Sequence, residues 1–562
     1  MSKVVTFARS TDYLHHRAQQ NRREGRMLDA LDLMRRVLER EPGNVEYQMD
    51  LAELLCEMDQ CAQSNNVLLR VLSGDTPMNE CHFGMCCNFL GLHDGAAAYS
   101  AMLRYLTGEP DAIVREEVQI TLASLVQPQS NYSGRRERRA QVLFAKAQAL
   151  LKSGATDEGA RMLARSLAQD PDAQLPRALL ALCLLMKRER KAAVQQMNMA
   201  LATGKADVRT RSIAVQVYGH AGHFGQMRRQ LDHLRKMPLD ADERRMLIHA
   251  LSELKQHRMV SDLISASLRQ APYDSWLLHR KAVSLINLGK SADEARRYWA
   301  QIVRLDPDDT IAQWYQSLAQ SGQLDNAHMD YAYQVTAEER DHRIAQMDEM
   351  LQLEEDGIRE MTQSRKTQNL IRWALLTGDP GISGRAFELI HFMQTQSAEQ
   401  MLRELLLVPD IEHRFKIAAL AELMERDANR PILMLAPDGR LCDALSDEPE
   451  PMELMPAPKR VLGIVARAQQ QATHKSASLV ESMWMDFVMQ SGEHMPRIRR
   501  PQGWAAALMA RRLKLADDPG AVRLIVEVFG CTERMMRYCL RRLDRVLKDG
   551  NDAGKEDTNE AD

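Results

Sequence analysis

The sequence predicts an all-α protein built mainly as a solenoid of stacked helix pairs. The main observation is a 34-residue period in two adjacent segments. The first copy is marked by Ala147, Leu150, Gly154, Leu163, Leu167 and Pro171. The second copy has, at the matching places, Ala181, Leu184, Arg188, Met197, Leu201 and Lys205. A period of this length corresponds to one helix–turn–helix hairpin, which can bury its apolar face only by stacking on a neighbour. A second observation is that only one short stretch has the character of β-strands.

This pattern resembles the tetratricopeptide repeat (TPR), which combines a small residue, apolar or aromatic anchors, a turn Gly, a small Ala and a helix-ending Pro. The small residue, the anchors and the closing Leu are present in both copies. The turn Gly and the final Pro are absent from the second copy, where Arg188 and Lys205 stand instead. The resemblance implies a solenoid whose concave face is lined by the first helix of each hairpin and binds proteins or peptides.

A first block of about three hairpins is expected over residues 10–115. Its opening repeat contains Leu14, Ala18, Gly25, Ala30 and Pro42 at the expected spacings. Gly25 suits the turn between the helices, because glycine adopts a positive φ without a steric penalty. Ala30 permits close approach of the two helices, and Pro42 ends the second one.

Residues 116–138 interrupt the period and are predicted to be a hinge, because the stretch contains loop formers followed by a run of Arg. A second block of about six hairpins is expected over residues 139–335. Its last hairpin is predicted from Ile311, Leu318, Gly322, Leu324 and Ala327.

Residues 336–430 lose the period but remain helical in pattern. Thr336 and Glu339 form a capping box at the start of one long charged helix, and further helix pairs of HEAT-like character follow. Residues 431–458 comprise a short β-hairpin, with its turn at Pro437-Asp438-Gly439, and then an acidic, Pro-rich linker.

Residues 459–548 are predicted to form a C-terminal helical bundle, and residues 549–562 a disordered acidic tail. The turn Phe529-Gly530-Cys531, with Thr532 as an N-cap, follows a helix-turn-helix plan. The stretch that begins at Trp504 is weakly similar to the C-terminal domain of a group of bacterial TPR proteins and to the cyclin-type repeat of transcription initiation factors. Residues 496–548 carry 13 Lys+Arg against 5 Asp+Glu, a local excess of 13 − 5 = +8.

The composition of the 562-residue chain favours a cytoplasmic protein. The net charge of −3 gives no global attraction to nucleic acid or membranes. We expect no membrane association, because the sequence has no secretory signal and no run of 18 apolar residues. Nine cysteines without a CxxC pair indicate reduced thiols. The cluster around Cys86 matches no common zinc spacing, so buried thiols are favoured over a metal.

Catalysis is not expected, and neither is a cofactor or a metal, because no nucleotide-binding, metalloprotease or nucleophile-elbow motif occurs.

The first hypothesis is a scaffold or adaptor that holds a protein or peptide in the solenoid groove. Its candidate groove residues are His15, Gln19, Arg22, Phe144, Gln148 and Lys152. The alternative is a regulator that binds DNA or RNA through a basic C-terminal helix, with the repeats as sensor. Its candidate contacts are Arg534, Arg537, Arg541, Arg545 and Lys548. The sequence predicts neither the partner's identity nor the oligomeric state.

Overall fold

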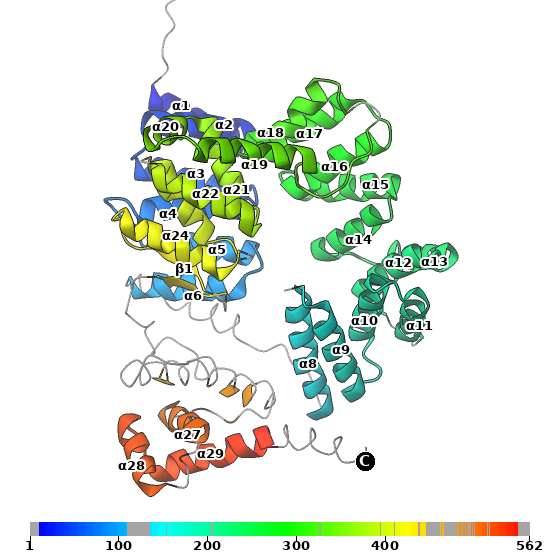
Figure 1. The fold of residues 1–562 in the computed structure, drawn as a ribbon, viewed down its shortest axis with the longest axis vertical. Coiled ribbons are helices and arrows are strands. Elements are labelled where there is room, and N and C mark those ends of the chain that lie inside the picture. The colour runs from blue at the N-terminus through cyan, green and yellow to red at the C-terminus, as the bar shows by residue number, and fades with distance from the viewer. Residues whose placement is uncertain are drawn as a thin grey trace, which may run out of the picture. The chain divides into compact units, whose positions relative to one another are not determined.

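The structure is a computed structural model, and its elements are labelled in Figure 1. It describes residues 10–108, 135–444 and 501–548, with short gaps at 153, 203, 205, 325–326, 394, 410, 437–438, 514 and 516–517, and scattered positions between 461 and 498. The predicted hinge, acidic linker and tail therefore lie wholly or mostly outside the described residues.

The chain forms two compact units, and each is described by itself. One comprises residues 1–125 and 251–447, and the other residues 126–250 and 448–562.

Three helical hairpins open the first unit. They are α1 (Thr11–Arg23) with α2 (Met27–Arg40), α3 (Val45–Glu57) with α4 (Cys61–Leu72), and α5 (Glu80–Gly91) with α6 (Gly95–Thr107). The predicted turn residue Gly25 has a φ of 74°, and Ala30 is fully buried. The first helices begin at polar caps: the Ser10 and Asn44 side chains accept hydrogen bonds from the backbone N–H groups three residues on.

The repeats continue as five further hairpins and one single helix. The hairpins are α8 (Arg135–Lys152) with α9 (Thr156–Gln169), α10 (Gln174–Met186) with α11 (Arg190–Leu201), α12 (Val208–Ala221) with α13 (Phe224–Leu234), α14 (Ala241–Glu253) with α15 (His257–Leu268), and α16 (Ser275–Asn287) with α17 (Ala292–Leu305); α18 (Thr310–Gln320) follows alone. The boundary between the two units falls inside α14. Arg188, at the turn-Gly position, is nevertheless left-handed, with a φ of 64°.

The prediction of a last complete hairpin is wrong. No second helix follows α18 in the described residues: 321–324 form turns, and 327–335 are non-helical until α19 begins. The apolar residues Tyr331 and Val335 in this segment are buried. Residues 327–335 therefore pack as an irregular, non-helical segment.

The chain ends its first unit with three pairs of helices and a β-hairpin. The helices are α19 (Ala337–Leu351), α20 (Glu355–Met361), α21 (Arg365–Leu376), α22 (Pro380–Phe392), α23 (Gln396–Leu406) and α24 (His413–Glu425). Thr336 caps α19 as predicted, accepting from the Glu339 N–H at 3.4 Å. The single long helix predicted here is instead two, because α20 restarts at Glu355 with an acidic first turn, which favours a helix N-terminus.

The predicted β-hairpin is confirmed. Strands β1 (Leu433–Leu435) and β2 (Leu441–Asp443) pair antiparallel, with Met434 opposite Cys442. Its turn residues 437–438 lie outside the described residues.

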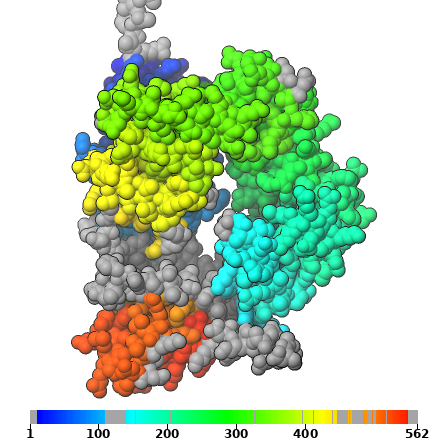
Figure 2. Space-filling view, in the orientation of Figure 1, coloured from blue at the N-terminus to red at the C-terminus, as the bar shows by residue number. Residues whose placement is uncertain are grey.

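The second-helix face of the first three hairpins, formed by α2, α4 and α6, is covered by later parts of the same unit. Helix α2 contacts α17, α4 contacts α23, and α6 contacts β2. Arg304 at the end of α17 pairs with Asp29 and Asp32 of α2, at 2.7 Å each. Residues more than 200 positions apart are thereby joined into one body. In Figure 1 α19–α24 lie in front of α1–α6, and in the space-filling view of Figure 2 they hide most of these helices.

The last described helices are α27 (Pro501–Leu513), α28 (Pro519–Val528) and α29 (Glu533–Lys548). Their core contains Trp504, Phe529, Met536 and Leu543. Thr532 caps α29 as predicted, since its hydroxyl accepts from the Met535 N–H at 3.3 Å.

Candidate peptide-binding faces of the hairpins

The N-terminal first-helix face is the surface formed by α1, α3 and α5. Within the described residues, the substantial helix contacts of these three helices are with one another and with α2, α4 and α6. The surface is polar along α1 and α3 and becomes apolar on α5. There Phe83 is 42% exposed and Leu90 is 38% exposed. A partner on this face would meet charged groups at one end and apolar side chains at the other.

Two of the candidate residues on α1 bind one carboxylate of α3. The Oδ2 atom of Asp50 lies 2.5 Å from Nε2 of His15 and 2.8 Å from Nε2 of Gln19. The His15 ring also lies 4.7 Å, centroid to centroid, from Tyr47. These contacts hold the side chains in place and connect one hairpin to the next.

Arg22, the third candidate, binds two further carboxylates of α3. Its guanidinium lies 2.5 Å from Glu57 and 3.3 Å from Glu53. The hydrogen bond with Glu57 is the main cause that raises the pKa of Arg22, so the group stays charged. The structure therefore brings all three α1 candidates together in a row of inter-hairpin ion pairs and hydrogen bonds.

The candidates on α8 do not form a comparable cluster. Phe144 is half-buried and packs against the small core that contains Ala147, Leu163 and Cys183, so packing accounts for its apolar character. Gln148 is exposed on the same helix. Lys152 is the last residue of α8, and its side chain lies outside the described residues.

A segment of the chain itself, residues 329–335, lies along the first helix of the last complete hairpin, α16. Asn287 holds the backbone of Met329 on both sides: its Nδ2 donates to the Met329 carbonyl at 3.0 Å, and its Oδ1 accepts from the Met329 N–H at 2.8 Å. Arg280 donates to the Tyr331 carbonyl at 2.9 Å. These bonds recognise backbone groups and do not depend on the side chains of the bound segment.

His279 and the neighbouring helices complete the contacts with this segment. His279 Nε2 lies 3.1 Å from the Ala332 carbonyl, and the Tyr315 hydroxyl donates to the Gln334 carbonyl at 2.8 Å. Burial lowers the pKa of His279 to about 3. The neutral imidazole therefore donates from Nε2, while Nδ1 accepts from the Trp299 indole N–H at 3.2 Å.

Asp309 fixes the far end of the segment through the Tyr333 side chain. The Tyr333 hydroxyl donates to Asp309 Oδ2 at 2.5 Å, and burial raises the pKa of both groups. The segment thus makes five backbone hydrogen bonds with α16 and α18 and two side-chain bonds, from Tyr333 to Asp309 and between Tyr331 and His257. The segment is non-helical, with bends at residues 331–334, and the helices hold it mainly through its backbone groups.

The basic candidates of α29 form an exposed face. Arg534, Arg537, Arg541 and Arg545 are all exposed. Arg537 pairs with Glu533 at 2.8 Å on the same helix. The side chain of Lys548 lies outside the described residues. The opposite side of α29 packs into the core through Met536, Cys539 and Leu543.

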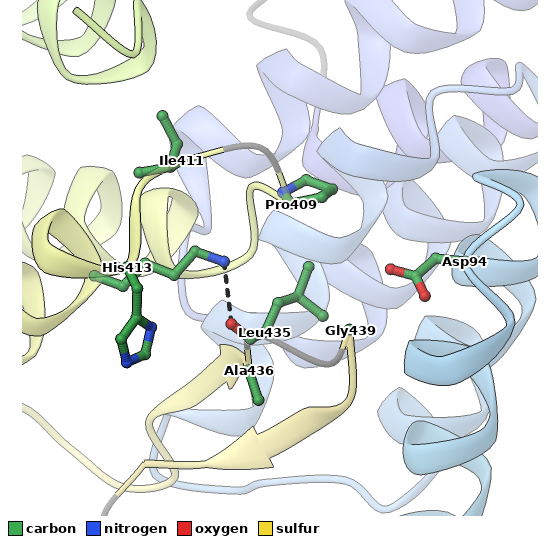
Figure 3. A pocket seen from close by; sticks show the side chains of 8 residues that line it. Asp94, Pro409, Ile411, His413, Leu435, Ala436 and Gly439 are labelled. Carbon is green, nitrogen blue, oxygen red and sulfur yellow. Dashed lines mark hydrogen bonds between the residues drawn. The ribbon is translucent and has the colours of Figure 1, made fainter. Parts of the chain in front are cut away.

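A small cavity of about 100 Å³ lies beside the β-hairpin, where α6 meets the loop that precedes α24 (Figure 3). Its wall includes the buried Lys416, whose Nζ donates to the Leu435 carbonyl at 3.1 Å. Asp94, on the other side, caps α6 by accepting from the Ala97 N–H at 3.1 Å. Both charged groups are thus used to hold backbone, and the cavity is a packing feature of the hairpin.

The sequence did not reveal Asn287, Arg280 and His279 as binding residues. Their positions on the first helix of a hairpin are the ones that line the groove in the predicted repeat, which is the one signal that could have selected them. The bound segment itself carries no periodic pattern, and it was mistaken for a helix.

No helix of the described chain is both long enough and apolar enough to cross a membrane.

No family model matches the sequence. A curated relative, TPR repeat-containing protein YvcD of Bacillus subtilis (strain 168), is 27% identical over 117 residues, which is 21% of this chain and 24% of the relative. The match therefore covers about a quarter of that protein.

Two solved structures illustrate the structural likeness. One is YrrB, described as a TPR protein with an unusual peptide-binding site: it is 17% identical, with a TM-score of 0.23 over 30% of this chain and 86% of that chain. The other is the TPR domain of P58(IPK), 11% identical, with a TM-score of 0.22 over 75% of this chain and 99% of that chain. Scores this low establish no shared global arrangement. The 34-residue spacing, the stacked helix pairs and the curated relative together identify the hairpins of this chain as tetratricopeptide-type repeats.

Proposed function

We propose that this protein is a non-catalytic scaffold that binds non-helical segments of partner polypeptides along the first helices of its repeats. The observation that carries the proposal is the seating of residues 329–335 on α16. Asn287 binds both the backbone N–H and the backbone C=O of Met329. The side chains of Arg280, His279 and Tyr315 bind three further backbone carbonyl groups of the segment. A surface that binds its own chain in this way has the donors and acceptors required for a foreign peptide.

The test for this binding mode uses the bound segment as a peptide. Residues 329–335 are replaced by a Gly/Ser linker of equal length, and the variant is titrated with a labelled synthetic peptide of residues 327–336. We expect the variant to bind the peptide and the unaltered chain, whose site is filled, to bind it far more weakly. Adding Asn287→Ala to the variant removes two hydrogen bonds of about 1 kcal/mol each, roughly a 30-fold loss of affinity.

The matched control is Asn66→Ala, on α4, which should leave the affinity unchanged. A linker variant that fails to bind the peptide would disprove the proposed binding mode. Equal loss from Asn66→Ala and Asn287→Ala would do the same.

For an external partner, the N-terminal first-helix face is the proposed site. Its second-helix counterpart is covered by the chain itself, while His16 and Arg23 of α1 are exposed. A photo-crosslinking residue at position 16 should capture a polypeptide in cells. The same residue at the exposed position 36, on α2, should not. Equal capture from both positions would contradict this assignment.

A second candidate function, nucleic-acid binding, is favoured by the exposed arginines of α29. Charges at this spacing can contact successive phosphates, and such binding weakens steeply with salt. The full chain should then bind duplex DNA at 50 mM but not at 200 mM salt. The double variant Arg537→Glu and Arg541→Glu should abolish binding, while charge reversal of the exposed Arg161 and Arg235 should not. Absence of binding at low salt would reject this function.

A further inference from the structure

A second surface of the first unit is an open groove of about 770 Å³ between α20, α22 and α24, joined at one end by Leu353 after α19. Its apolar lining includes Ile358, Phe387 and Phe392, and Ala418 and Ala421 on α24. The groove does not belong to the first-helix faces, because its helices come after the last repeat.

The outer side of α24 adds exposed apolar side chains beside the groove. Ile417 is 48% exposed and Met424 is 53% exposed, and Ala421 lies between them at helical spacing. Ala418 and Ala421 are both exposed and small, so another helix can approach the backbone of α24 closely. Leu353, across the groove, is 44% exposed. An apolar surface of this kind is typical of an interaction site.

The charged residues of the lining are all acidic. Glu355, Glu388, Glu422 and Glu425 line the groove, and no Lys or Arg does so among the described residues. Glu355 pairs with Arg359, and Glu422 pairs with Arg426. For Glu388 and Glu425, the described part of the chain provides no ion pair. The lining thus presents, around an apolar floor, two carboxylates that form no ion pair with the described residues, although Arg385 attracts Glu388 from beyond ion-pair distance.

Metal binding does not account for these carboxylates. One donor atom from each of His391, Glu422 and Glu425 can lie within 4.8 Å of the others. However, Arg426 donates to Glu422 from Nε at 2.8 Å, and it is fixed by further bonds to the carbonyls of Ile390 and Met393. Its guanidinium neutralises Glu422 and would oppose a cation at this position.

We propose that this groove binds a basic amphipathic helix of a partner protein. Apolar side chains of that helix at i, i+3 or i+4 and i+7 would fill the space above Phe387 and Phe392. Lys or Arg on its flanks would meet Glu388 and Glu425. The same carboxylates repel nucleic acid and anionic membrane surfaces, so charge complementarity selects a cationic polypeptide.

The test uses the full chain and a fluorescent 15-residue amphipathic peptide of Leu and Lys. Fluorescence anisotropy at low salt should show saturable binding. The double variant Glu388→Lys and Glu425→Lys should weaken it at least tenfold. Ala421→Tyr, which places a large side chain on the groove surface, should also weaken it at least tenfold. The control Glu39→Lys with Glu294→Lys alters net charge equally at two exposed sites on other helices and should change the affinity less than twofold.

Two control peptides separate the groove from simple charge attraction. A peptide with Glu in place of Lys, and one of the same composition with the amphipathic pattern scrambled, should not bind. The proposal is overturned if no binding occurs at 100 µM peptide, if the scrambled peptide binds equally, or if the control variant loses as much affinity. A dimer whose dissociation follows Ala421→Tyr would assign the groove to a second copy instead, and binding lost on adding EDTA would assign it to a metal.

Discussion

Lowering the pH from 7 to 5 should loosen residues 329–335 through His279. Burial lowers the pKa of His279 to about 3, against 6.5 for an exposed imidazole. Between these two values the opened state binds a proton that the closed state does not, so stability falls as the pH falls below 6.5. At pH 5 the loss is 1.36 kcal/mol per unit over 1.5 units, or about 2 kcal/mol. Protonation at Nδ1 would also set an N–H group against the Trp299 indole N–H.

The assay is hydrogen–deuterium exchange of peptides covering residues 328–335, comparing the unaltered chain with His279→Gln at each pH. Gln offers a similar donor and acceptor but does not titrate. At pH 7 the two proteins should exchange at similar rates. When the pH is lowered to 5, the opening frequency of the segment should rise roughly 30-fold more in the unaltered chain than in the variant. Asp309 and His257, which also contact the segment, are present in both proteins, so their titration cancels in the comparison. The reasoning is refuted if the ratio of the two exchange rates is the same at both pH values.

Three further results are expected. Arg188→Gly should raise the free energy of unfolding of the α10–α11 hairpin by up to about 1 kcal/mol, because it removes a non-glycine residue with a left-handed backbone. A melting temperature below that of the unaltered chain would contradict this. Burial raises the pKa of the Cys81 and Cys86 thiols to about 12, so at pH 8 both should react with a disulfide reagent only after denaturation, as peptide mapping would show. Gly503→Val should destabilise the C-terminal helices by about 1–3 kcal/mol, because a Cβ at this position would lie 2.5 Å from Met535; unchanged exchange protection in α27 and α29 would show that the site adapts.

Local features of the fold could be predicted from the sequence because their causes are local. The turn at Gly25, the buried Ala147 and Ala181, and the caps at Thr336 and Thr532 all follow from the conformational and hydrogen-bonding properties of one residue and its neighbours. The β-hairpin could be found for the same reason. These features lie at the level of secondary structure and of single hairpins.

The arrangement of side chains on the first-helix faces could not be predicted, because it depends on contacts between residues distant in the sequence. Nothing near Arg22 indicates that its partners are Glu53 and Glu57, more than thirty residues on. The seat of residues 329–335 was missed for another reason. Asn287 and Arg280 bind main-chain groups, which are the same in every sequence, so the bound segment has no pattern that could reveal it.

The covering of α2, α4 and α6 by α17, α23 and β2 has a consequence for the way the protein is made. When the third hairpin has been synthesised, the covering partners of α4 and α6, which are α23 and β2, lie some 300 residues further on. At 5–20 residues per second, these helices wait roughly 15 s to a minute with an unpaired surface. We therefore expect a nascent chain that is arrested after about residue 150, with all three hairpins outside the exit tunnel, to recruit general chaperones. Arrest after about residue 490 should release them, because β2 has then left the tunnel as well.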